Sequence, residues 1–342
     1  MASRVRFAAF VAVGTQLSGE VPDPRPVWTR QLFLARQDFP IPGSIPTFRW
    51  HTGTNGVKAR PMDQTLARPP MEAAAPSALG PRSYGAVNWL GLWTLCLRET
   101  RRFWKVGMQT LFAPVVSSLL MLFVFKMAFN QNGAQSPGGV QFETFLAPGV
   151  VMMAILTNAF ANTSSSLIIA KVQGNSVDFL MPPLSPLELT VGFLSGAVTR
   201  GILVGSVTFA AVWIMQITPF HVSNLWAVVY YSVVASLLMG AIGLLGGIWA
   251  DKFDHMAAVQ NFVIMPLTML SGTFYPISRL GEPFQTISHG NPFFHLIDGF
   301  RYGFTGHAEG DLLMGALYTL VLTLALCATC WALFRSGYKL KA

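Results

Sequence analysis

The sequence has little charge for its size. Only 11% of its 342 residues are Asp, Glu, Lys or Arg, whereas 52% are hydrophobic and the mean hydropathy is +0.47. A soluble domain carries about 25% charged residues. The chain lacks the side chains to cover a water-facing surface, which excludes an ordinary soluble domain and indicates an integral membrane protein.

Cysteine is also scarce, and the three present, Cys96, Cys327 and Cys330, make no disulfide framework. Cys327 and Cys330 have C-x-x-C spacing but lie in the apolar run LYTLVLTLALCATCWALF, where small packing residues are favoured over a redox or metal role. No GxxxxGK[ST] phosphate loop occurs anywhere in the sequence. The chain is therefore not expected to hydrolyse ATP by itself.

The net charge of +8 belongs to the front of the chain. Residues 1–105 carry fourteen Lys/Arg and six Asp/Glu, whereas residues 106–342 carry nine of each. Residues 1–83 contain many Pro and Arg without a sustained period, which predicts a disordered N-terminal extension. No nucleic-acid motif accompanies the basic residues, so nucleic acid is not an expected partner. A translation start at Met62 or Met71 is the alternative to a genuine tail.

Six apolar segments are predicted to cross the bilayer, which takes about 20 residues each. Residues 201–250 contain no charged residue and are divided by the turn cluster ITPFHVSN. The predicted spans are 106–125, 144–170, about 194–216, about 225–249, a fifth from about His255, and about 312–334. The expected fold class is an all-α integral membrane protein, with six transmembrane helices in residues 106–342.

The distribution of Lys and Arg predicts the orientation, because cytoplasmic loops carry an excess of both. One side of the predicted bundle carries nine of these residues: Arg98, Arg101, Arg102, Lys105, Lys171, Lys252, Arg335, Lys339 and Lys341. The other side carries Lys126, Arg279 and Arg301. Both termini are therefore expected in the cytoplasm, with the chain multi-pass in the plasma membrane.

Residues 84–105 are predicted to form an interfacial amphipathic helix before the first span. In NWLGLWTLCLRETRRFWK, apolar and basic residues alternate at helical spacing. Trp89 and Trp93 are expected in the acyl boundary, with Arg98, Arg101 and Arg102 on lipid phosphates. The alternative, a plain basic flank of the first span, leaves the two tryptophans unexplained.

Arg200 is the charged residue inside the predicted spans. An intramembrane charge is costly, and snorkelling to the cytoplasmic headgroups is favoured over a buried substrate contact. Glycines at helical spacing on the third and fourth spans predict close helix packing there, as in many polytopic bundles. They are Gly192, Gly196, Gly201, Gly205, Gly240, Gly243 and Gly247.

The loop AKVQGNSVDFLMPPLSPLELTVG predicts a short cytoplasmic helix between two breaks. Gly174 ends one helix, Pro182 and Pro183 break the chain, and Ser185-Pro186 followed by Glu188 starts the next. The short helix has an apolar face of Val177, Leu180 and Met181. A solvated loop does not need that face, so it packs on the bundle or meets a cytoplasmic protein.

The fifth span is broken where it should leave the bilayer, by Pro266, Ser271-Gly272 and Pro276. Two segments of about ten residues follow, EPFQTISH and PFFHLIDGFRYGF, each about half as long as the hydrocarbon core. Irregular backbone at that depth is sheltered by protein or lines a wet cavity. We expect short re-entrant helices that form an external gate, with five polar residues facing the outside: Arg279, Glu282, His289, Asp298 and Arg301.

These segments resemble the membrane subunit of type-2 ABC exporters, a permease family that includes nodulation lipo-oligosaccharide and multidrug exporters. The resemblance runs from about residue 85 to the end. The stretch MPLTMLSGTFYPISRLGEPFQTISHGNPFFHLIDGFRYGFTG looks like the family's signature near the last two spans, and FLAPGVVMMAILTNAFANTSSS is similar to its second span. The signature positions are Pro266, Ser271, Gly272, Pro276, Asn291, Pro292, Asp298 and Arg301.

GNSVDFLMPPLSP resembles the coupling-helix segment, which in that family docks on the ATPase subunit. The residues concerned are Gly174, Val177, Asp178, Leu180, Met181 and Pro182. Here only Lys171 is charged in the lead into Gly174, which departs from the family's acidic or Arg-rich lead. The resemblance implies an exporter of amphipathic molecules, such as a drug, a lipid or a lipid-linked saccharide.

The resemblance also implies a homodimer or heterodimer of permease subunits with two separate ATP-binding subunits. ATP and Mg²⁺ are expected on that partner, with no cofactor on this chain, and the location implied is a bacterial inner membrane. No residue identifies the substrate.

Two other functions fit the sequence less well. An ion-coupled carrier usually places carboxylates at the midplane and often shows inverted repeats, and neither is evident. An intramembrane enzyme with a metal on His289, His295 and Asp298 is weighed against plain polar surface, which is favoured.

Overall fold

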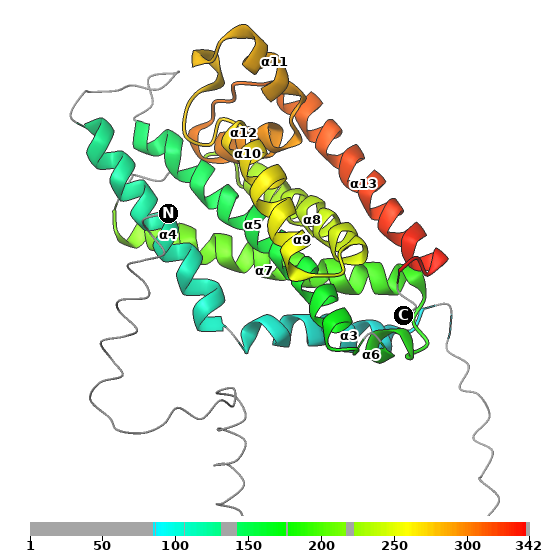
Figure 1. Ribbon diagram of the computed structural model, residues 1–342. Coiled ribbons are helices and arrows are strands. Elements are labelled where there is room, and N and C mark those ends of the chain that lie inside the picture. Colours follow the sequence, from blue (N-terminus) through cyan, green and yellow to red (C-terminus); the bar gives the residue numbers. More distant parts are fainter. Residues whose placement is uncertain are drawn as a thin grey trace, which may run out of the picture. The chain divides into compact units, whose positions relative to one another are not determined.

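The computed structural model describes Gly85 and residues 87–105, 107–130, 142–175, 177–216 and 222–339. These lie in the compact unit Leu79–Ala342, and the predicted extension 1–83 lies outside them. Every regular element of the described residues is helical (Figure 1). In chain order they are α3 (Trp89–Trp104), α4 (Gly107–Asn130), α5 (Phe142–Val172), α6 (Val177–Leu180), α7 (Pro186–Ile214), α8 (Leu225–Trp249), α9 (Phe253–Val259), the π-helical turn η3 (Gln260–Ile264), α10 (Met265–Met269), the 3₁₀ turn η4 (Ile277–Arg279), α11 (Glu282–Gly290), α12 (Pro292–Thr305) and α13 (Leu312–Ser336).

Five of the described helices are long and apolar enough to cross a membrane, namely α4, α5, α7, α8 and α13. They confirm helices at the first four and the last of the predicted spans. The helix that contains the third begins at Pro186, eight residues before the expected start of the span near 194. This confirms the helix start predicted at Ser185-Pro186 and Glu188, which form a capping box.

The fifth predicted span is shorter than the others. α9, η3 and α10 follow one another without a gap from Phe253 to Met269, a run of 17 residues. Pro266 does not end this run. It lies in the first turn of α10, directly after the wide π-helical turn, where a missing N–H is tolerated. The helix ends instead just before Ser271 and Gly272.

α5 is the central helix of the unit, with 78% of its most apolar segment buried, against 17% for α4 and for α13. It packs along α7 and α8, and the largest core cluster joins it to α8 and α12. The close helix packing predicted at the glycines of the third and fourth spans is confirmed. For example, a Cβ at Gly243 of α8 would lie 2.4 Å from Thr163 Oγ1 of α5, and one at Gly205 of α7 would lie 2.5 Å from Ile155.

Several of the other elements lie at two opposite ends of the five long helices (Figure 1). α3 and α6 lie at one, called here the α3 end, and α10, α11 and α12 lie at the other, called the α12 end. At the α3 end, Lys171 donates to the carbonyls of Ile248 and Ala250, and Lys339 donates to that of Trp249 at 3.0 Å. The two ammonium groups thereby cap the last carbonyls of α8.

Candidate functional site

The predicted coupling segment is a single helical turn held between two breaks at the α3 end. Gly174 ends α5 in the left-handed conformation, with φ of +70°, which a side chain would strain. α6 follows, and Pro182 is exposed just beyond it. Leu180 and Met181 are 40% and 80% exposed. Asp178 is exposed as well, while the side chain of Val177 lies outside the described residues.

α6 is anchored by Phe179, which the sequence reasoning did not single out. Its side chain is buried and meets the ring of Phe193 edge-on at 5.5 Å, and Phe193 in turn stacks on Phe334 of α13 at 6.0 Å. Phe179 alternates with the exposed positions, a local signal that sequence inspection could have used. The turn thus packs on the bundle with one side and leaves Leu180 and Met181 uncovered.

Glu188 holds the start of α7 and the start of α3 together. Ser185 Oγ accepts from the Glu188 N–H at 3.3 Å, and Glu188 Oε2 accepts from the Ser185 N–H at 2.6 Å, which makes a capping box. The other oxygen, Oε1, accepts from the Asn88 N–H at 2.6 Å, just before α3. One carboxylate therefore serves the N-termini of two helices 100 residues apart in sequence.

α3 presents two kinds of face. Trp89, Trp93 and Trp104 are 64–73% exposed, and Arg98 and Arg101 are exposed too. Leu95, Glu99 and Phe103, four residues apart, are buried. Leu95 packs where α7 has Gly192, because a Cβ at that glycine would lie 2.3 Å from Leu95 Cδ2.

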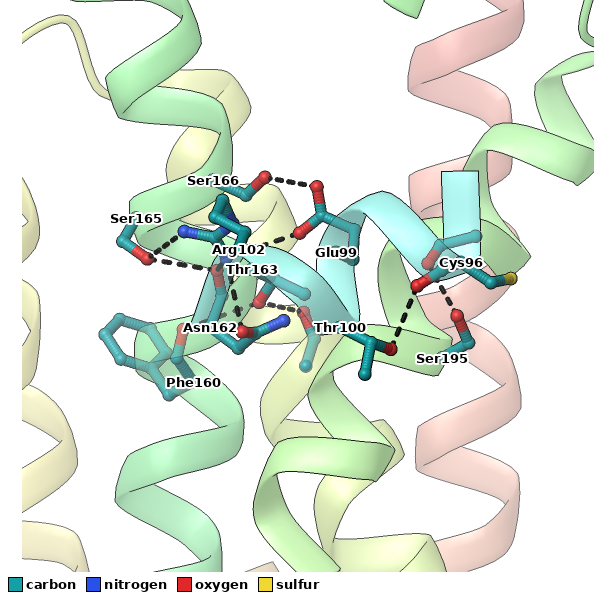
Figure 2. A network of polar contacts seen from close by, with 12 residues as sticks. Cys96, Glu99, Thr100, Arg102, Phe160, Asn162, Thr163, Ser165, Ser166 and Ser195 are labelled. Atoms are coloured by element: carbon teal, nitrogen blue, oxygen red, sulfur yellow. Dashed lines mark hydrogen bonds and ion pairs between the residues drawn. The ribbon is translucent and has the colours of Figure 1, made fainter. Parts of the chain in front are cut away.

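Arg102 does not share the exposed face of α3 with Arg98 and Arg101. Its guanidinium turns inward and donates to the Asn162 carbonyl at 2.7 Å and to Ser165 Oγ at 3.0 Å. Nη2 also lies 3.3 Å from Glu99 Oε2. Figure 2 shows this network between α3 and α5. Sequence reasoning missed it because the partners are 60 residues away, although an acid at the buried Glu99 position was a readable signal.

Arg200 does not reach toward the end of α7. It lies 14 residues after Pro186, about 21 Å along the helix axis. Its Nη2 donates to Asn158 Oδ1 of α5 at 3.1 Å, and its Nε is buried without a hydrogen-bond partner. The snorkelling interpretation is therefore wrong, because the guanidinium turns to the neighbouring helix.

Next to Arg200 along α7 lies an apolar pocket of about 200 Å³ between α5, α7, α8 and α12. Its lining includes Val151, Ile155, Ile202, Phe209, Val228 and Phe300. Ser206 and Ser232 supply polar atoms.

Asp298 and Arg301 do not face the outside as polar surface. Each is 3% exposed. Arg301 donates from Nε to the Phe145 carbonyl at 3.1 Å and from Nη2 to the Gly272 carbonyl at 2.8 Å, and it lies 3.7 Å above the Phe145 ring. Asp298 accepts from the N–H groups of Glu309 and Gly310 at 3.0 and 2.9 Å. Sequence reasoning took this pair for surface because its partners are backbone groups.

Asn291 links α12 to the broken end of α10. Its Oδ1 accepts from the Phe293 N–H and caps α12, while its Nδ2 donates to the Leu267 carbonyl at 2.8 Å and to Ser271 Oγ at 2.9 Å. Gly272 then turns the chain with φ of +69°. Pro276 is buried, whereas Pro266 is exposed and Pro292 opens α12 half-buried.

The loop before α13 completes this cluster through Glu309. Its Oε2 accepts from the Ile277 N–H at 3.0 Å, and its Oε1 is buried without a partner. Burial raises the pKa of the Glu309 carboxyl, although the Arg301 charge opposes that shift. The signature residues therefore converge on one interlocked cluster, the α12-end cluster, of Asn291, Asp298, Arg301, Ser271 and Gly272.

His289, His295 and Asp298, considered above as metal ligands, do not form a metal site in the structure. His295 Nε2 lies 2.9 Å from the His289 carbonyl, and Asp298 is occupied by the two backbone N–H groups. Across the described residues, no three His, Cys, Asp or Glu side chains gather in a way that could hold a metal ion.

Comparison with known proteins identifies the family. The model of the ABC-2 type transporter family matches residues 91–305, from the first turn of α3 to the end of α12. The inner membrane transport permease YadH of Escherichia coli strain K12 is 33% identical over 254 residues, which is 74% of this chain and 98% of that protein. The chain belongs to the ABC-2 type transporter family.

Relatives of lower identity carry other names. Nodulation protein J of Rhizobium leguminosarum bv. trifolii is 26% identical over 238 residues, covering 67% of this chain and 85% of that protein. The probable multidrug ABC transporter permease YbhR of Escherichia coli strain K12 is 25% identical over 200 residues, covering 57% and 53%. Membership of this family confirms the resemblance read from the sequence and favours an ABC permease over a carrier or an intramembrane enzyme.

Proposed function

We propose that this chain is the permease subunit of an ABC exporter that moves an amphipathic substrate outward across a bacterial inner membrane. ATP and Mg²⁺ are bound by two copies of a separate ATPase subunit, and two permease subunits, identical or different, form the pathway. The family and its transport permease relatives support the general role. The observation that carries the mechanism is the exposed apolar pair of Leu180, the last residue of α6, and Met181, which follows it, next to the buried Phe179.

The proposed topology has six spans, with α9, η3 and α10 as the fifth. At about 25 Å this run is shorter than the hydrocarbon core of about 30 Å, and the cluster beyond it continues into the bilayer. α11 and α12 are the re-entrant helices of the external gate. α3 is the interfacial helix, with its tryptophans in the acyl boundary and Arg98 and Arg101 toward phosphates. The α3 end and both termini are cytoplasmic.

Rigidity qualifies α6 as the coupling contact, because a flexible loop would absorb the displacement that ATP binding produces. The buried Phe179 ties α6 to α7 through Phe193, and the capping box fixes the start of α7. Lys171 is engaged by α8 carbonyls. Lys171, the only charged residue in the lead into Gly174, therefore has a structural role. Docking is assigned to the apolar side chains of Leu180 and Met181.

The experiment is co-purification of the permease with its ATPase subunit, followed by substrate-stimulated ATP hydrolysis. Leu180→Asp or Met181→Asp places a charge in the contact and is expected to weaken association at least tenfold, because burying an unpaired charge costs several kcal/mol. Membrane insertion should be unchanged.

Gln173→Asp is the matched control, since it adds the same charge to an exposed residue of the same loop outside α6. Normal association of both α6 variants would contradict the proposal, and α3 would become the better candidate for the docking surface.

A further inference from the structure

Arg200 is a half-buried cation with its Nε buried, and it has no countercharge among the described residues. It takes part in no ion pair there, and its one hydrogen-bond partner, Asn158, is neutral. It is also close enough to Arg102 for the two guanidinium groups to repel each other. A charge in the middle of an apolar helix is retained only where something compensates it.

Glu99 does not supply that compensation. Its side chain is fully buried, its Oε1 accepts from Ser166 Oγ at 2.8 Å, and its Oε2 faces Arg102 at 3.3 Å. Both oxygens of the Glu99 carboxylate are therefore already engaged, one by Ser166 of α5 and one by Arg102 of α3. The two arginines and one carboxylate leave the group with one surplus positive charge.

Hydrogen-bonding capacity is unbalanced in the same direction. Three buried donors of this group have no hydrogen-bond partner within the described part of the chain, namely Arg102 Nε, Asn162 Nδ2 and Arg200 Nε. The corresponding acceptor, Glu99 Oε2, is already ion-paired. A group with surplus donors and surplus positive charge is complementary to an anion, whose oxygens only accept.

The apolar pocket lies one helical turn beyond this group. Ile155 precedes Asn158 on α5 by three residues, and Ile202 follows Arg200 on α7 by two, and both isoleucines line the pocket. A polar head held by the arginines would therefore continue directly into apolar surroundings. That sequence of environments matches an amphipathic molecule with one acidic end.

We propose that Arg200, with Arg102, Asn158 and Asn162, forms a binding site for the anionic headgroup of an amphipathic molecule, and that the pocket takes the start of its apolar tail. The headgroup chemistry is a phosphate, sulfate or carboxylate. This deepens the proposed exporter function, on which it rests, by naming an acidic cargo. A phospholipid of the bilayer has the same chemistry and is the other source of ligand.

The test uses two probes with the same tails, dioctanoyl phosphatidic acid and the uncharged dioctanoylglycerol. Native mass spectrometry of the full chain in detergent should show at least tenfold tighter binding of the phosphate. Arg200→Gln should abolish that preference. Arg335→Gln, which removes an exposed charge from α13, is the control and should keep it. Equal affinity of the two probes for the unaltered chain would overturn the proposal.

Asn158→Asp decides the case even if Arg200→Gln fails to fold. It keeps the guanidinium and places an internal carboxylate at the position that Arg200 already contacts at 3.1 Å. The variant should fold and lose the preference for the phosphate, because Arg200 is then neutralised from within. Retention of the full preference in this variant would overturn the proposal.

ATP hydrolysis by the complex distinguishes the two sources. Stimulation by phosphatidic acid but not by dioctanoylglycerol identifies a transported cargo. Binding without stimulation, together with a phospholipid that co-purifies with the chain but not with Arg200→Gln, identifies a resident lipid. The binding measurements need no ATPase subunit, so a failure of coupling through α6 and a failure of this site give separate results.

Discussion

Single residues determine much of the α12 end. Asp298 and Arg301 lie one turn apart on α12, and each uses its charge on backbone groups from other segments. These residues hold loops in place by hydrogen bonds that no hydrophobic pattern records.

Asp298→Ala is expected to destabilise the protein markedly. The substitution leaves the N–H groups of Glu309 and Gly310 without an acceptor, at about 1–3 kcal/mol for each buried group. Thermal unfolding of the full chain in detergent should show a clear drop in Tm.

Asp311→Asn is the matched control at a nearby acid. Asp311 caps α13 from an exposed position, and asparagine caps helices equally well. Its Tm should stay close to that of the unaltered protein. No drop for Asp298→Ala, or an equal drop in both variants, would contradict the role assigned to Asp298.

Residues whose environment is local were the predictable ones. Gly174 predicted the end of one helix and Ser185 and Glu188 the start of the next, and the structure has helix ends at these positions. Arg102 and Arg200 were misread because their partners lie on another helix, 60 and 42 residues away. Sequence periodicity gives the face of a residue but not the helix that the face meets.

At the scale of elements, glycine faces control how closely the helices approach. α8 meets α5 at Gly243, where a Cβ would lie 2.4 Å from Thr163 Oγ1 and 2.6 Å from the Phe160 carbonyl oxygen. Backbone cannot yield as a flexible side chain can. The sequence spacing predicted this close packing correctly, although it could not say which helix each glycine faces.

Gly243→Ala should therefore force α5 and α8 apart. Overpacking of this kind typically costs about 1–3 kcal/mol, and the yield of folded protein and its Tm should both fall. Gly246→Ala, three residues later on α8, is the matched control, because the nearest atoms there belong to the flexible end of Met256. Similar behaviour of the two alanine variants would contradict the assigned role of Gly243.

At the scale of the whole molecule, five long apolar helices and the family are established, while the sixth crossing and the orientation are proposed. The fifth predicted span differs from the others because it is short and contains a π-helical turn. Hydropathy alone locates such a segment but does not give its depth in the bilayer, which depends on the cluster that shelters its end.

Reporter fusions test the proposed topology. Fusions after Lys341 and within residues 171–186 should report the cytoplasm. A fusion at Gln135, which lies outside the described residues, should report the external side. The reason is the excess of Lys and Arg on the α3 side. A cytoplasmic signal at Gln135 would rule out the six-span arrangement.

The shared carboxylate of Glu188 has a consequence for how the membrane itself enters the transport cycle. α3 carries three exposed tryptophans, and the backbone just before it donates a hydrogen bond to Glu188. The same side chain caps the start of α7, which follows the segment proposed to contact the ATPase. If α3 lies in the interface as proposed, we expect lateral pressure or surface charge of the inner leaflet that shifts α3 to act on the coupling segment. We then expect lipid composition to change the ATPase rate through the contacts of Glu188.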